Sequence, residues 1–161
     1  MMHKITQKGE VVKNIGFNFT TNDFRYCVLE KNGSTVAFVE KDKINYPKAL
    51  DVASTAGWLE TQICLLLDKH TPNAVGYKLP LTLKSTKPIQ NSIFPLGILN
   101  LCCNKRNIPI NHYTSQGINA TKFGLKTKDD VYAYVDSHIG QHPPYWDKQT
   151  KDAALVAWFL L

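Results

Sequence analysis

The sequence predicts one α/β domain built on a five-stranded mixed sheet that is flanked by helices. Two observations lead to this prediction. Three β-rich segments follow one another with short turns between them, which indicates an antiparallel meander. Further along the chain, helix-like and strand-like segments alternate, which is typical of right-handed crossover connections. The expected order is three strands, a helix, a strand, a helix, a strand and two helices.

The meander is predicted over residues 11–40. The segment 11–19 (VVKNIGFNF) is β-rich with partial alternation of apolar and polar residues, and the turn TTND separates it from a second strand at 24–30. The dipeptide Asn32-Gly33 is a strong hairpin signal, since both residues tolerate the positive φ angles of a tight turn. It leads into a third strand at 35–40.

The hydrophobic period changes after the meander. Between 46 and 70 the apolar residues recur every three to four positions, and Pro47 suits a first helical turn, so this segment is predicted to be a helix. The following segment, 71–80 (TPNAVGYKLP), reads as a turn and a short buried strand centred on Val75.

The C-terminal half continues the alternation. A helix is predicted at 93–107 and a strand at 109–114. A third helix is expected at 127–139, because Thr127 and Asp130 have the spacing of a capping box. The apolar residues of the last predicted helix are Ala154, Leu155, Trp158 and Phe159.

The composition is that of a globular protein. The chain has 161 residues, of which 43% are hydrophobic and 20% charged, which suits one domain at 11–161 behind a polar tail at 1–10. No apolar run has the length of a membrane span and no signal-peptide core is present, so a cytoplasmic location is expected. The net charge of +6 favours a polyanionic partner.

Neither the cysteines nor the histidines predict a metal site. Cys27, Cys64, Cys102 and Cys103 lie in apolar segments without paired ligand spacing, and in a reducing compartment they are expected to be small buried hydrophobes. His138 and His142 are four residues apart, but Gly140 and two prolines make one continuous helix across them doubtful.

The order of elements and four short motifs resemble the ribonuclease H-like superfamily, specifically RuvC-type Holliday-junction resolvases. NIGFNF resembles the first strand of that family, TPNAVGYKLP the fourth, and TKDAALVAWFLL the last helix. The stretch HYTSQGINATKFGLKTKDDV is a weaker match, in which Gly124 and Lys128 correspond to a family glycine and lysine. The resemblance covers roughly residues 12–161.

The resemblance implies two-metal phosphodiester hydrolysis by carboxylates from the first strand, the fourth strand and the last helix, with cations about 4 Å apart. This chain departs from that pattern. The family's acidic positions fall on Asn18, Lys78 and Asp152, and a further acid of the last helix falls near Leu155. One carboxylate beside one ammonium is expected to form a salt bridge. When the last twelve residues, Thr150 to Leu161, are considered alone, they instead predict that Asp152 caps a helix.

Other acids do not supply a replacement triad. Glu40 is expected to end the third strand, and Asp51 and Glu60 to lie on the first helix. Asp129 and Asp130 are expected to stabilise a helix N-terminus. No cofactor is therefore expected, and Mg²⁺ or Mn²⁺ is implied only if the chain is an active nuclease.

Two loops are candidates for nucleic-acid binding. The loop after the fourth strand holds Lys84 and Lys87 among Ser, Thr, Gln and Asn residues, which are phosphate-contacting types. A second segment combines basic residues with an aromatic ring that could stack on a base. Its candidate residues are Lys122, Phe123, Lys126 and Lys128.

Three functions follow from these observations. The preferred one is a catalytically degenerate, RuvC-like protein that binds branched or duplex DNA, or RNA, and no membrane. The first alternative is a working metal-dependent nuclease that resolves Holliday junctions through other ligands. The second is an interaction module or homodimer in which the apolar helix 93–101 forms an interface.

Overall fold

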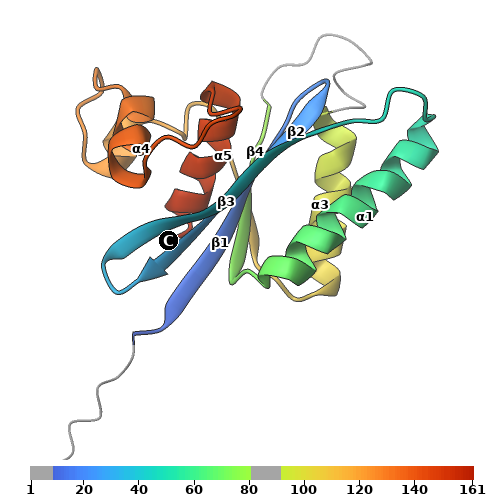
Figure 1. Cartoon of the computed structure of the whole chain (residues 1–161), viewed down its shortest axis with the longest axis horizontal. Coiled ribbons are helices and arrows are strands. Elements are labelled where there is room, and N and C mark those ends of the chain that lie inside the picture. The colour runs from blue at the N-terminus through green and yellow to red at the C-terminus, as the bar shows by residue number, and fades with distance from the viewer. Residues whose placement is uncertain (1–8, 81–91) are drawn as a thin grey trace, which may run out of the picture.

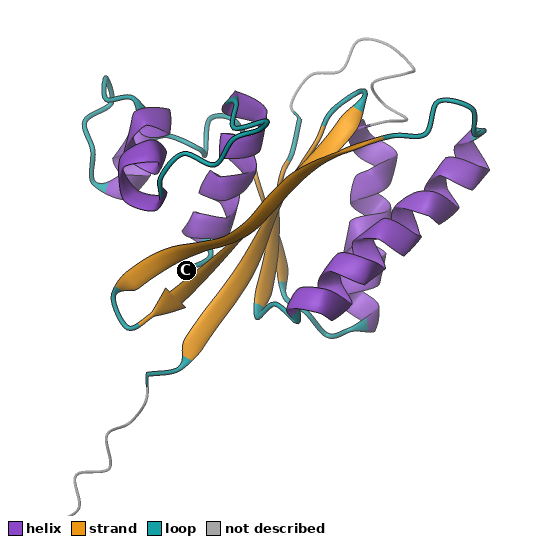
Figure 2. Cartoon of the chain, in the orientation of Figure 1, coloured by secondary structure: helices purple, strands orange, loops and turns teal. Residues whose placement is uncertain are grey.

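Helices cover both faces of a twisted five-stranded sheet in the computed structural model, which describes residues 9–80 and 92–161 (Figures 1 and 2). The strands are β1 (Val11–Phe19), β2 (Asp23–Asn32), β3 (Thr35–Asn45), β4 (Ala74–Lys78) and β5 (Ile110–Tyr113). The helices are α1 (Val52–His70), α3 (Phe94–Lys105), α4 (Val131–Ile139) and α5 (Lys148–Phe159), with a 3-10 turn, η2, at Ala120–Phe123. The predicted element order and sheet class are confirmed.

The sheet has the strand order β3-β2-β1-β4-β5. β1, β2 and β3 form the expected antiparallel meander, and Gly33 at the second turn has a φ of +63° that favours glycine. β4 pairs parallel with β1, and β5 parallel with β4. Parallel neighbours place the C-terminal ends of β1 and β4 at the same edge of the sheet.

Alternation along β1 divides the core into two parts. Ile15, Phe17 and Phe19 belong to an apolar cluster that α1 and α3 cover on one face of the sheet. Asn14, Gly16 and Asn18 alternate with them and face the opposite side, which α5 covers. The two faces of β1 therefore separate the apolar cluster under α1 and α3 from the polar positions of β1 under α5. A second apolar cluster, formed by β2, α4 and α5, lies on the α5 side.

Glycine allows α5 to lie directly on the sheet. A Cβ atom added to Gly16 would lie 1.9 Å from the carbonyl oxygen of Ala153, which is far inside van der Waals contact. Gly76 is the partner of Gly16 in β4, and a Cβ atom added there would lie 2.6 Å from Cγ1 of Val156. The absence of these two side chains lets α5 pack closely on β1 and β4.

Several boundaries differ from the predictions. α1 begins at Val52 and not at 46, because the side chain of Asp51 caps it by accepting a hydrogen bond from Ser54 N at 2.7 Å. α4 begins at Val131, with Asp130 and not Thr127 as its cap. β3 continues to Asn45, so Glu40 lies within the strand and does not end it.

α5 is capped by Asp147, whose side chain accepts a hydrogen bond from Thr150 N. The interpretation of Asp152 as a helix cap is therefore wrong.

Among the helices that the structure describes, none combines the length and the apolar character that a membrane span requires.

Candidate functional site

An ion pair joins β4 to α5 at the edge of the sheet where the resemblance placed acidic residues. Lys78 Nζ lies 2.7 Å from Asp152 Oδ2. Lys78 is the last residue of β4, and Asp152 lies in the second turn of α5. The exposed fractions of the two side chains are 22% and 5%, so the carboxylate is almost completely shielded from solvent. The expected contact between Lys78 and a carboxylate is therefore present.

Tyr132 occupies the second oxygen of the same carboxylate. Its hydroxyl donates a hydrogen bond to Asp152 Oδ1 at 2.9 Å. Burial raises the pKa of Tyr132, and the negative charge of Asp152 raises it further, so the phenol stays protonated and acts as a donor. Both oxygens of Asp152 are thus bonded to protein groups. Tyr132 is not among the residues that the sequence predicts for the site.

Asn18 lies beside this pair and contacts α5 one turn earlier. β1 and β4 are in register at Phe17 and Tyr77, which makes Asn18 and Lys78 the next residues along neighbouring strands. The Asn18 amide donates to the backbone oxygen and to Oε1 of Gln149, each at 2.9 Å. The three predicted positions therefore converge on the first two turns of α5, and the Asn18 amide is held by Gln149.

A second buried cation lies next to Asn18 on the same face of the sheet. Arg25, the β2 partner of Asn18, donates from Nε to Asp23 at 2.9 Å and from Nη1 to Asp147 at 2.5 Å. Nη1 also donates to Thr150 Oγ1 at 3.0 Å. Burial alone would lower the pKa of Arg25, but the hydrogen bonds to Asp147 and Asp23 raise it overall. This network fixes the N-terminus of α5 to the meander.

Glu40, His138 and His142 have partners elsewhere in the fold. Glu40 pairs with Lys69 and His70 at the end of α1. His138 stacks on Tyr134, whereas His142 lies beyond the end of α4 and stacks on Phe38. Across 9–80 and 92–161, no group of three or more His, Cys, Asp or Glu side chains is arranged to hold a metal ion.

The predicted basic segment leads directly into the site. Lys122, Lys126 and Lys128 are all exposed, and α4 begins three residues after Lys128. The first turn of α4 carries Tyr132, which contacts Asp152. Lys84 and Lys87 lie outside the described residues.

Phe123 has a packing role that no local sequence pattern indicates. Its ring stacks on Phe159 at 4.8 Å between centroids and contacts Tyr134 and Trp158 at 5.3 and 5.6 Å. The ring is half-buried in this aromatic cluster. Stacking of a base on Phe123 remains a prediction, and it would have to use the part of the ring that the cluster leaves open.

Lys148 adds a positive charge that is not among the predicted site residues. It is the first residue of α5, is exposed, and places Nζ 5.5 Å from the centroid of the Tyr132 ring. A lysine at a helix start carries no distinctive sequence signal, so only the fold shows that it lies next to the partner of Asp152.

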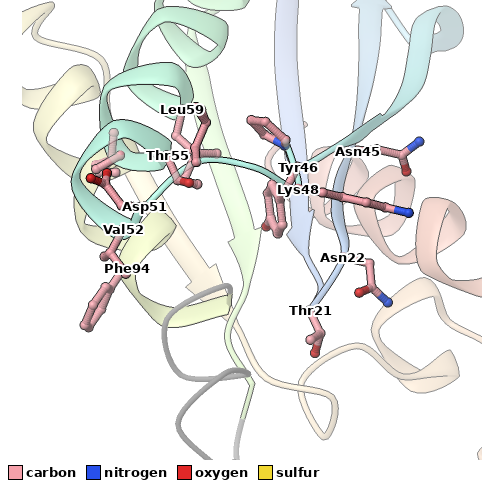
Figure 3. Close-up of a pocket in the computed structure, with 14 residues that line it drawn as sticks. Thr21, Asn22, Asn45, Tyr46, Lys48, Asp51, Val52, Thr55, Leu59 and Phe94 are labelled. Atoms are coloured by element: carbon pink, nitrogen blue, oxygen red, sulfur yellow. The ribbon is translucent and has the colours of Figure 1, made fainter.

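A separate cavity of about 820 Å³ lies on the α1 and α3 side of the sheet (Figure 3). It is bounded by the turn between β1 and β2, by the end of β3 and by the N-terminus of α1. Thr21, Tyr46, Lys48 and Phe94 are among the side chains around it. None of the described residues predicted to form the functional site lines this cavity.

The comparisons with known proteins agree with the fold. No protein-family model and no curated protein matches the sequence. The structure of Thermus thermophilus RuvC in complex with Holliday junction substrate has a TM-score of 0.77 at 14% identity, covering 92% of this chain and 91% of that chain. Another structure of Thermus thermophilus RuvC has a TM-score of 0.75 at 13% identity and covers 92% of each chain.

A third similar structure is the yeast mitochondrial Holliday junction resolvase Ydc2, with a TM-score of 0.68 at 14% identity, covering 96% of this chain and 79% of that chain. These likenesses extend over nearly the whole chain and include the five-stranded mixed sheet with its flanking helices. The chain therefore has the ribonuclease H-like fold of RuvC-type Holliday-junction resolvases.

Proposed function

We propose that this protein binds nucleic acid through a RuvC-like fold and has lost metal-dependent cleavage. The observation that carries the proposal is the contact of 2.7 Å between Lys78 Nζ and Asp152 Oδ2. It puts an ammonium group at the position where the resemblance implies a metal-binding acid. Lys78, Asp152 and Tyr132 satisfy one another by hydrogen bonds and charge.

The residues at this position do not fit a pair of divalent cations. Mg²⁺ prefers several hard oxygen ligands in near-octahedral geometry. Here Asp152 is the only carboxylate of the trio, and both of its oxygens accept hydrogen bonds from protein groups. Asn18 offers one neutral oxygen, and Lys78 would repel a cation. The buried guanidinium of Arg25 adds a second positive charge on the same face.

Nucleic-acid binding is supported by charge and by position. The chain has a net charge of +6, and exposed Lys122, Lys126 and Lys128 precede the helix that carries Tyr132. Lys148, the first residue of α5, adds an exposed positive charge beside Tyr132. Lysine side chains bind phosphates without reading sequence, and the release of counterions makes such binding sensitive to salt. Thermus thermophilus RuvC, which has the same fold, was solved in complex with Holliday junction substrate.

Binding titrations test this proposal. We expect fluorescence anisotropy to detect binding to at least one of four labelled probes at low salt: a four-way junction, a duplex, a single DNA strand and an RNA strand. Mg²⁺ is not expected to strengthen binding relative to EDTA, because no metal ion takes part and divalent counterions compete for the phosphates. No binding to any probe in the micromolar range would contradict the proposal.

A second candidate function is pairing of the chain with another copy through the α1 and α3 face. Four large apolar side chains on these helices are exposed: Val52 at 48%, Leu65 at 61%, Phe94 at 49% and Leu101 at 51%. Exposed apolar groups on neighbouring helices favour an interface. Light scattering after size exclusion should then give a dimer that Leu101→Lys converts to a monomer. A wild-type monomer at high micromolar concentration would remove this candidate.

A further inference from the structure

Two cysteines that are 38 residues apart in the sequence, Cys64 and Cys102, lie in contact in the interface between α1 and α3. Cys64 Sγ lies 3.7 Å from Cys102 Sγ, and both thiols are free. Cys102 is buried and Cys64 is half-buried, so Cys64 is the more accessible of the two. Since the two helices are packed together, the thiols are held face to face.

The surroundings of the two thiols differ. Burial raises the pKa of Cys102 to about 12, and the contact with Cys64 adds to this effect. Arg106, the residue after α3, contacts the Cys64 side chain and donates from Nη1 to the backbone oxygen of Cys102 at 3.3 Å. The cationic guanidinium of Arg106 therefore lies next to the more accessible of the two sulfurs. The arrangement gives one accessible thiol and one shielded partner.

We propose that Cys64 and Cys102 form an oxidation site, in which a disulfide links α1 to α3 when the protein meets a disulfide oxidant. The inference does not depend on nucleic-acid binding. From their separation of 3.7 Å, the sulfurs would have to approach by roughly 1.6 Å to reach the bond length of about 2.05 Å. Rotation of the two side chains within the interface supplies this movement.

The chemistry is a pair of thiol–disulfide exchanges. The Cys64 thiolate attacks oxidised glutathione, forms a mixed disulfide and releases one glutathione thiolate. The Cys102 thiolate then attacks the sulfur of Cys64 and releases the second. The two cysteines lose two electrons and two protons, and oxidised glutathione is reduced to two molecules of glutathione.

Peptide mapping of the full chain after incubation with oxidised glutathione tests the proposal. We expect one cross-link within the chain, which Cys64→Ala and Cys102→Ala abolish. Cys103→Ala is the matched control, because Cys103 is the adjacent residue of α3 and is fully buried. It should retain the cross-link. The melting temperature of the oxidised wild type should exceed that of the reduced protein by about 5–10 °C.

Three results would overturn the proposal: no cross-link in the folded wild type, a cross-link between two chains, or loss of the cross-link in Cys103→Ala but not in Cys102→Ala. Circular dichroism confirms that each variant is folded before oxidation. If Cys102→Ala does not fold, Cys64→Ala tests the proposal instead, because Cys64 is only half-buried. Its melting temperature should not respond to oxidised glutathione.

Discussion

Lys78 and Asp152 are 74 residues apart in the chain, and their side chains meet at 2.7 Å between the end of β4 and the second turn of α5. This contact has two consequences. It neutralises the one carboxylate that the family's acidic pattern retains in this sequence. It also ties the last helix to the sheet.

Breaking this ion pair is expected to destabilise the fold. Lys78→Met leaves a carboxylate that is 5% exposed without its cation, and should lower the free energy of unfolding by roughly 3 kcal/mol. Asp152→Asn should cost less, because the lysine side chain can extend to solvent. The double variant should lose less than the sum of the two.

Urea unfolding measures these differences. Asp68→Asn provides a control, because its ion pair with Arg106 lies on the surface and its removal should barely change stability. Additive losses in the double variant would show that Lys78 and Asp152 are not energetically coupled.

The position of α5 depends on Gly16. Gly16→Ala should destabilise the protein strongly, by more than about 3 kcal/mol, because the added methyl would lie 1.9 Å from the backbone oxygen of Ala153. Gly57→Ala is the matched control, since no atom lies within 4 Å of its added Cβ and alanine favours the helix. Thermal unfolding should show a large loss for the first variant and a gain for the second. Equal melting temperatures would mean that α5 does not pack as described.

Acid should destabilise the fold through three carboxylates. Burial alone would raise the pKa of Glu40, Asp136 and Asp147, but their hydrogen bonds to cations, such as Arg25 to Asp147, lower each pKa overall. A lowered folded-state pKa gives stability above the unfolded pKa of about 4, and this stability is lost as the pH falls through the folded value. When the melting temperature is measured from pH 7 down to pH 3, it should begin to decrease below about pH 4. Asp136→Asn should make this decrease smaller. A wild-type melting temperature that stays unchanged down to about pH 3 would refute the role of the three carboxylates.

Salt dependence tests the basic surface. If Lys122, Lys126 and Lys128 contact phosphates, replacing each by alanine should lower the slope of log affinity against log salt by roughly one unit or less. Lys105→Ala is the control, because this exposed lysine ends α3 on the other side of the sheet. If all four variants keep the slope of the wild-type protein, the binding surface lies elsewhere.

Phe123→Ala is expected to weaken binding to a single strand at any salt concentration, because stacking contributes about 1–3 kcal/mol per base. Since the ring packs against Phe159 and Tyr134, this variant should also lose stability. Its melting temperature must therefore be measured beside its affinity, and unchanged affinity of the folded variant would exclude a stacking role.

Most of the fold could be predicted from local sequence patterns, whereas most of the site could not. The strand 11–19 matches β1 because its residues alternate between two environments, and Asn32-Gly33 marks the hairpin between β2 and β3 because few residues adopt that turn. The predicted start of α1 at 46 differs from the observed start at Val52 because both Pro47 and Asp51 are residues typical of a helix start. The structure uses Asp51, whose side chain caps the helix.

The contacts of the site depend on tertiary structure. The family resemblance identifies Lys78 and Asp152, and their opposite charges predict the ion pair. Tyr132 and Arg25 carry no local signal, because their roles arise only when α4, α5 and β2 come together. The segment that begins at Thr150 suggests a cap at Asp152 because it leaves out Asp147, the residue that caps α5.

The most direct test of the central claim follows binding and cleavage in the same sample. The wild-type protein is incubated with an end-labelled four-way DNA junction in Mg²⁺ or Mn²⁺, and the complex and the products are resolved on native and denaturing gels. We predict a retarded complex and no cleavage with either ion. Metal-dependent cleavage that disappears in Asp152→Asn would contradict the account, and absence of any complex with this and the other probes would contradict its binding half.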